Sequence, residues 1–199
     1  MQTATQKGLA PVTFFVDKAA SRFTVQAFAT GMLSSFGHNP TIGIRDYEGE
    51  IQFVPETYEK AFLRMSLKNT GLDVLDEMKS DDRKKLEKIM YEQVLEVEHF
   101  PTTVYESKEI RVEKPGNGSI LARVNGELSF HGVTQGLALV GRVVDMGSLL
   151  RISGDFVVRQ SDFGIKPVSF AAGTLRLKDE LKFKFELTAR RQEVSAPSE

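Results

Sequence analysis

The sequence predicts an all-β protein with one or two short helices, folded as an antiparallel barrel in a single domain over residues 1–199. Three observations support this prediction. Apolar and polar residues alternate with period two in many segments, which is the pattern of strands with one buried and one solvated face. Turn residues separate these segments, and only one segment has the pattern of an amphipathic helix. All-β barrels commonly reach this length as one domain.

The predicted strands follow one another at short intervals. In the clearest one, Arg22–Thr30, Phe23, Val25 and Ala27 share one face, and Arg22 lies on the other. In chain order we expect eight to ten strands from the segments Val12–Asp17, Arg22–Thr30, Gly49–Val54, Lys60–Lys68, Thr102–Val112, Ser119–Phe130, Thr134–Asp145, Leu149–Gln160 and Thr174–Ala189, the last with a break near Asp179.

Turn chemistry falls between these strands. Asn69–Gly71, His131–Gly132 and Gly147–Ser148 suit chain reversals through glycine or asparagine conformations, and such short connections predict antiparallel neighbours. Asn125-Gly126 also resembles a hairpin turn. Because neighbouring turns already bound its segment, we interpret Gly126 as a bulge or a close backbone approach within a strand.

One helix is predicted from Ser80 to about Leu95, with Ser80 as its N-cap. Its apolar stripe consists of Leu86, Ile89, Met90 and Val94, and its other positions are mostly charged. Such a helix is expected on the flank of the barrel or across one end, with its charged face in water.

Composition excludes several functions. The net charge of −1 creates no field that would collect nucleic acid, and the absence of cysteine excludes disulfides and thiolate chemistry. No segment reads as a transmembrane span. Residues 1–10 show no export signal, so we expect a cytoplasmic location, or a periplasmic one if the N-terminus has been trimmed. Residues 192–199 are expected to form a disordered tail.

Three histidines are the candidates for a metal site: His38, His99 and His131. Three imidazoles and a water form a known zinc arrangement, but no HxH or HExxH spacing relates these residues. Since each lies beside a turn, local hydrogen bonding explains them better. The sequence also lacks a nucleophile elbow and a phosphate-binding loop.

The barrel interior therefore becomes the candidate site, because eight strands enclose room for either packed side chains or one small ligand. Periodicity alone leaves these two alternatives equal. The expected lining is aliphatic and phenylalanine-rich and consists of Val25, Ala27, Leu63, Met65, Leu67, Leu128, Phe130, Leu139, Phe156, Val158, Phe183, Phe185 and Leu187.

Several motifs, in the same order and spacing, resemble the YceI-like family. They are Ser34–Ile42 (SSFGHNPTI), Gly126–Thr134 (GELSFHGVT), Ser161–Ile165 (SDFGI), and Phe100-Pro101 followed by the strand Thr103–Ser107. The resemblance runs from about Phe15 to Arg190. It implies an extended, lipocalin-like, eight-stranded antiparallel barrel with a helical insertion, which encloses a polyisoprenoid or similar lipid.

The resemblance favours a ligand-filled lumen over a packed one. We expect a binding or carrier protein for an amphiphilic long-chain lipid, without catalytic residues, metal or cofactor, and with a homodimer implied by the family. Arg22, Arg159 and His38 are the candidates for contact with a polar head group. The alternatives are a metal-dependent enzyme using the histidines and an interaction domain with a filled core.

Overall fold

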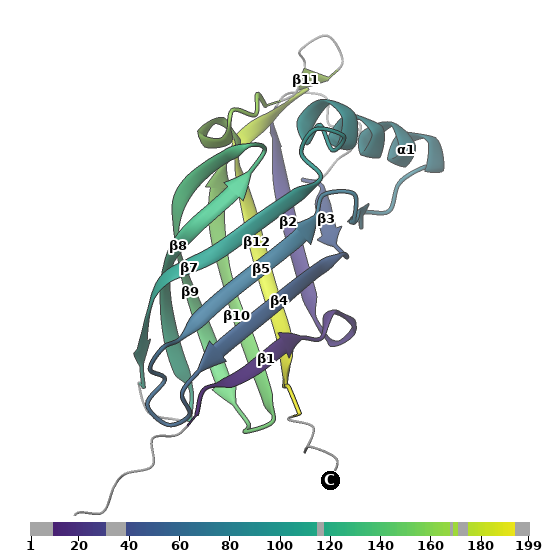
Figure 1. Cartoon of the computed structure of the whole chain (residues 1–199). Helices are drawn as coiled ribbons and strands as arrows, with labels where there is room; N and C mark the ends of the chain where they lie inside the picture. The colour runs from purple at the N-terminus through teal and green to yellow at the C-terminus, as the bar shows by residue number, and fades with distance from the viewer. Residues whose placement is uncertain (1–9, 31–38, 115–117, 168, 171–174, 194–199) are drawn as a thin grey trace, which may run out of the picture.

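The computed structural model describes residues 10–30, 39–114, 118–167, 169–170 and 175–193. The described part contains twelve strands in one sheet and one α-helix (Figure 1). The strands are β1 (Val12–Val16), β2 (Arg22–Thr30), β3 (Thr41–Ile44), β4 (Tyr47–Phe53), β5 (Phe62–Lys68), β6 (Leu72–Val74), β7 (Thr102–Glu113), β8 (Ile120–Phe130), β9 (Val133–Asp145), β10 (Leu149–Arg159), β11 (Ser169–Phe170) and β12 (Leu175–Arg191). The helical elements are η1 (Lys18–Ala20), α1 (Ser80–Ile89), η2 (Met90–Val94) and η3 (Gln160–Phe163).

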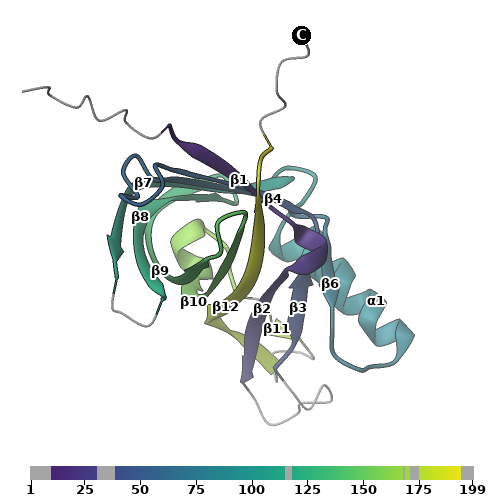
Figure 2. The same cartoon turned by 90° about the horizontal axis from the view of Figure 1, so that it is seen from below.

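Eight of these strands close an antiparallel barrel. Neighbouring strands pair in the order β1, β4, β5, β7, β8, β9, β10 and β12, and β12 returns to β1 through the register Phe14–Arg191 to Val16–Ala189. Strands β2, β3 and β6 extend the sheet from the other part of β12. Figure 2, a view from below, shows these strands arranged in a closed ring. The predicted all-β barrel with a helical insertion is confirmed.

Side-chain alternation gives the barrel its apolar interior. In β12, Phe185 and Leu187 are buried, whereas the alternating positions Lys182, Lys184 and Glu186 are exposed. The same alternation in β2 buries Phe23, Val25 and Ala27. A strand with this period can pack one face inside a closed sheet and keep the other in water.

The observed strands differ from the predicted ones in places. β12 runs through the expected break near Asp179, and the irregularity takes the form of a register shift against β2 between Leu177 and Leu181. The sequence analysis missed β3, β6 and β11, which are four, three and two residues long. Strands this short contain too few residues for a period-two pattern to be recognised.

Gly126 lies inside β8, as the sequence indicated, and not in a hairpin turn. A Cβ atom on Gly126 would lie 2.4 Å from the carbonyl oxygen of Glu106 and 2.6 Å from the hydroxyl of Tyr105. The opposite strand, β7, has a register shift between Ser107 and Glu109. The glycine therefore permits a close approach of backbone and tyrosine beside a bulge.

The predicted helix consists of α1 followed by a π-helical turn, η2. Its N-cap is Lys79 without a side-chain cap bond, so the prediction of Ser80 as the cap was wrong, and Ser80 is the first helical residue. In Figure 1, α1 lies at the same end of the barrel as β11. No helix of the described part is long and apolar enough to span a membrane.

The expected C-terminal tail, residues 192–199, lies mostly outside the described residues. At its start, the backbone N–H of Gln192 donates a hydrogen bond to the carbonyl of Thr13 at 2.8 Å.

Candidate ligand-binding cavity

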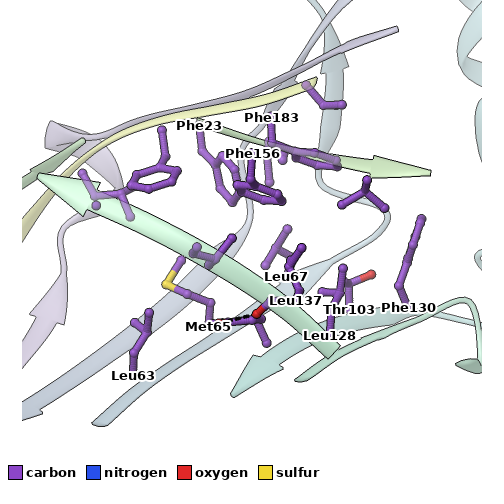
Figure 3. A pocket seen from close by; sticks show the side chains of 18 of the residues that line it. Phe23, Leu63, Met65, Leu67, Thr103, Leu128, Phe130, Leu137, Phe156 and Phe183 are labelled. Atoms are coloured by element: carbon purple, nitrogen blue, oxygen red, sulfur yellow. Dashed lines mark hydrogen bonds between the residues drawn. The ribbon is translucent and has the colours of Figure 1, made fainter. Parts of the chain in front are cut away.

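An apolar cavity of about 280 Å³ lies inside the barrel. Strands from all around the barrel contribute to its wall. Figure 3 shows Phe23, Phe156 and Phe183 on one side of this space and Leu63 and Met65 on the other. Among the residues that the structure describes, the lining includes no charged side chain.

All thirteen apolar residues that the sequence analysis assigned to the interior line this cavity. They are Val25, Ala27, Leu63, Met65, Leu67, Leu128, Phe130, Leu139, Phe156, Val158, Phe183, Phe185 and Leu187. The period-two pattern identifies them because it fixes which face of each strand points inward. Their contact with a ligand stays a prediction.

Four of the phenylalanines form an aromatic cluster in the wall. The rings of Phe156 and Phe183 stack with centroids 4.8 Å apart and an interplanar angle of 3°. Phe23 contacts Phe183 and Phe185 with centroid distances of 6.2 and 6.4 Å. Phe156 and Phe183 keep part of their surface accessible, so this cluster presents flat apolar faces to the lumen.

Many other residues of the lining were not predicted from the sequence, and Phe23 and the helical stripe are two examples. Phe23 was assigned to the same face as Val25 but was not included among the candidates. The apolar stripe of the helix was assigned to a barrel surface without being placed in the site, and the structure puts Leu86, Ile89, Met90 and Val94 in the lining. The helical insertion therefore forms part of the wall of the cavity.

Polar side chains in the lining bond to other protein groups. Asn69 donates from Nδ2 to the carbonyl of Phe100 at 2.7 Å, and its Oδ1 accepts a bond from Oγ1 of Thr103 at 2.8 Å. Gln160, which is buried, donates to the carbonyl of Lys178 at 2.9 Å. These contacts remove the cost of burying the polar groups and use donors that a ligand would otherwise bind.

Tyr105 is the other polar group deep in the wall. Its hydroxyl can donate to two carbonyl groups, that of Leu137 at 3.1 Å and that of Val124 at 3.4 Å. Burial raises the pKa of Tyr105 to about 12, because the phenolate would lose its hydration there. The phenol is therefore neutral at physiological pH and gives the cavity no charge.

One end of the barrel is filled by a separate apolar cluster. Phe14 and Phe53 stack with centroids 5.4 Å apart, and Leu150 and Ala189 pack against them. Tyr58 covers Phe53 at 5.2 Å and donates from its hydroxyl to Asp145 at 3.2 Å. This cluster forms a floor beneath the cavity, since Phe53, Tyr58 and Leu150 also belong to the lining.

The expected head-group residues do not line the cavity. Arg22 is exposed on the outer face of β2, because its neighbour Phe23 points inward. Arg159 is exposed as well, and its Nη2 lies 3.7 Å from Oε1 of Glu180. Both arginines therefore lie outside the cavity lining, and their contact with a polar head group near the barrel mouth stays a prediction. His38 lies outside the described residues.

The remaining histidines pack around one carboxylate. Nε2 of His131 lies 3.4 Å from Oε1 of Glu96 without making a hydrogen bond, and Nδ1 of the exposed His99 lies 3.8 Å from Oε2. The ring of His131 contacts that of Phe100 at a centroid distance of 4.2 Å. In the described part of the chain, no three His, Asp or Glu side chains are placed to hold a metal ion.

The motifs Phe130-His131-Gly132 and Ser161–Ile165 thus have an architectural role. Gly132 has a φ of +74° and leaves no space for a Cβ, which would lie 2.7 Å from the ring of Phe100. Phe163, in η3, packs its ring 5.4 Å from that of Phe130. Together they hold η3 and the β8–β9 turn at the end of the barrel that lies opposite the floor.

Comparison with known proteins agrees with this architecture. Residues 14–189 match the model of the YceI-like domain. BcnA of Burkholderia cenocepacia has a similar structure, with a TM-score of 0.67 and 16% identity over 87% of this chain and 98% of BcnA. A second similar structure is a polyisoprenoid binding domain from Saccharophagus degradans that is implicated in plant cell wall breakdown. Its TM-score is 0.64, and its sequence identity is 12% over 92% of this chain and 99% of that domain.

The YceI protein of Campylobacter jejuni also has this fold, with a TM-score of 0.57 and 16% identity over 76% of this chain and 85% of that protein. At these identities the structural likeness concerns the fold alone. No curated protein matches the sequence. Because the family model covers nearly the whole barrel, the chain belongs to the YceI-like family.

Proposed function

We propose that this protein binds one amphiphilic long-chain lipid, of the polyisoprenoid class, and sequesters or transports it in the barrel lumen. The observation that supports this most is the uncharged lining of the cavity, in which polar side chains bond to the protein itself. Such a surface offers a ligand apolar contact and little hydrogen bonding. It therefore favours a hydrocarbon tail over a polar metabolite.

The energetics of burial are sufficient for useful affinity. A tail that buries about 400 Å² gains on the order of 10 kcal/mol at about 25 cal/mol per Å², before the cost of association is subtracted. Branched isoprenoid units also suit the stacked ring faces of Phe156 and Phe183. The name of the Saccharophagus domain, which refers to polyisoprenoid binding, supports the same class of ligand.

Native mass spectrometry of the purified protein tests this proposal directly. We expect an added mass that disappears on denaturation, and organic extraction should then yield a long-chain lipid in stoichiometric amount. The same spectrum tests the homodimer that the family resemblance implies. Protein without such a mass that also fails to take up geranylgeraniol would contradict the proposal and support a barrel with an interaction role.

A further inference from the structure

The barrel wall is weakly joined between β9 and β10. Their ladder contains four residue pairs, from Leu150–Asp145 to Ser153–Arg142. Each of these strands has eleven pairs with its other neighbour, β8 or β12. Beyond Ser153 and Arg142, toward the end of the barrel that carries η3, no pairing between the two described strands is present.

We define the seam as residues 136–139 of β9 and 155–158 of β10, which do not pair with each other. Leu137 and Phe156 face the cavity from its two edges. At the end of the seam near η3, Nε2 of Gln135 donates to the carbonyl of Asp162 at 3.4 Å. Separation of the two strands along the seam thus breaks no backbone ladder and would open the cavity sideways.

Exposed apolar side chains gather on the outer face of the β9–β10 hairpin, with Val140 and Val157 at the seam and Val144 and Met146 toward its paired end. Five large apolar side chains are exposed in the described part of the chain, and four of them lie on or beside β9 and β10. These are Val140 (42% exposed), Val144 (38%), Met146 (58%) and Val157 (49%), whereas Phe15 lies on β1. Such clustering on the surface of a soluble domain marks an interaction site.

The same face carries two arginines, although the whole chain has a net charge of −1. Arg142 and Arg151 are exposed among the apolar residues, and neither makes an ion pair with any described residue. The neighbouring Asp155 is already paired with Lys182 at 3.4 Å. The surface therefore combines apolar side chains with two available positive charges.

We infer that this face docks on an anionic phospholipid surface and that the ligand tail enters or leaves the cavity through the β9–β10 seam. The inference rests on the proposed lipid-binding function. Valine and methionine can enter the interfacial region of a bilayer while the arginines contact phosphate groups. A second copy of the chain is a poorer partner, because a twofold contact through this face would bring arginines of like charge together.

Vesicle cosedimentation tests the docking. We expect the wild-type protein to bind phosphatidylcholine vesicles containing phosphatidylglycerol, more weakly at high salt, and to bind pure phosphatidylcholine poorly. Arg142→Glu with Arg151→Glu should lower the affinity for anionic vesicles at least about tenfold. Lys84→Glu with Lys85→Glu, on the exposed side of α1, makes the same charge change elsewhere and should leave vesicle binding nearly unchanged.

The contribution of the exposed apolar side chains is tested by a second pair of variants. Val140→Ser with Val157→Ser should slow the transfer of an anthraniloyl-labelled farnesol from anionic vesicles to the protein, whereas Phe15→Ser should not. Uptake of the same probe from solution, without vesicles, should be equal in all variants. This second assay separates the two proposals, since a wild-type protein that takes up no probe from solution contradicts the lipid-binding function itself.

Three outcomes would overturn the docking inference while leaving lipid binding intact. They are normal probe uptake without binding to anionic vesicles, equal loss of vesicle binding in the two charge variants, and a concentration-dependent dimer of the wild type that Val140→Ser with Val157→Ser abolishes. The last result would assign the face to a second copy of the chain.

Discussion

A larger side chain inside the lumen should weaken ligand binding without lowering the stability of the fold. Ala122 lies in β8, lines the cavity, and pairs in register with Gly141, which has no side chain to compete for the lumen. In Ala122→Phe, a ring that buries roughly 150–250 Å² takes part of the ligand's place. If about 100 Å² of ligand contact is lost, binding weakens by about 2.5 kcal/mol, or roughly 60-fold in Kd.

The assay is a titration with a fluorescent farnesol, combined with thermal unfolding without ligand. Because the new ring replaces empty space with apolar contact, the Tm of the ligand-free variant should be equal to or above that of the wild type. Ala19→Phe, an exposed position in η1, makes the same substitution outside the barrel and should keep the wild-type Kd. Unchanged affinity in a folded Ala122→Phe variant would refute the assignment of the lumen as the binding site.

Three further predictions concern stability. Gly126→Ala should cost about 1–3 kcal/mol in urea unfolding, since its Cβ meets backbone, whereas Gly136→Ala, with no atom within 4 Å, should stabilise by about 0.4–1 kcal/mol. His131→Ala should lower the Tm markedly, whereas the exposed His99→Ala should not. A chelator should leave the Tm of both variants unchanged, and a lower Tm of the wild type with chelator would instead indicate a metal site. The pKa of Tyr105 is raised from an ordinary 10 to about 12, so its neutral phenol contributes its full stabilisation of the fold below pH 10. This contribution is lost as the pH rises from 10 toward 12. Between these two pH values, the free energy of unfolding should therefore fall less in Tyr105→Phe than in the wild type.

The direction of strand side chains could be read from the sequence because each residue's face follows from its place in the strand. Phe183 and Phe185 alternate with lysines, and this alone puts both rings inside. The same rule points Arg22 outward, so this side chain does not belong to the cavity lining. Arg159 follows Val158, which faces inward, and is exposed for the same reason.

Other parts of the site depend on contacts that periodicity does not encode. The apolar stripe that contains Leu86 and Met90 predicted a helix, but only tertiary packing determines that the stripe faces the lumen. The short ladder between β9 and β10 is also invisible in the sequence, since Val133–Asp145 and Leu149–Arg159 both read as complete strands. Strand patterns indicate which residues can pair, and the curvature of the closed sheet decides which do.

The pairing of β1 with β12 has a consequence for synthesis of the chain. Val16 and Ala189 are partners across this junction, so the circle of strands can close only after the ribosome has made nearly all of the barrel. Until then, the phenylalanines and leucines of the earlier strands have no complete interior to enter. Such long-range closure is slow and exposes apolar surface to aggregation. The nascent chain therefore exposes apolar strand faces until its last strand is made, and a lipid present during synthesis would meet these faces before the finished barrel.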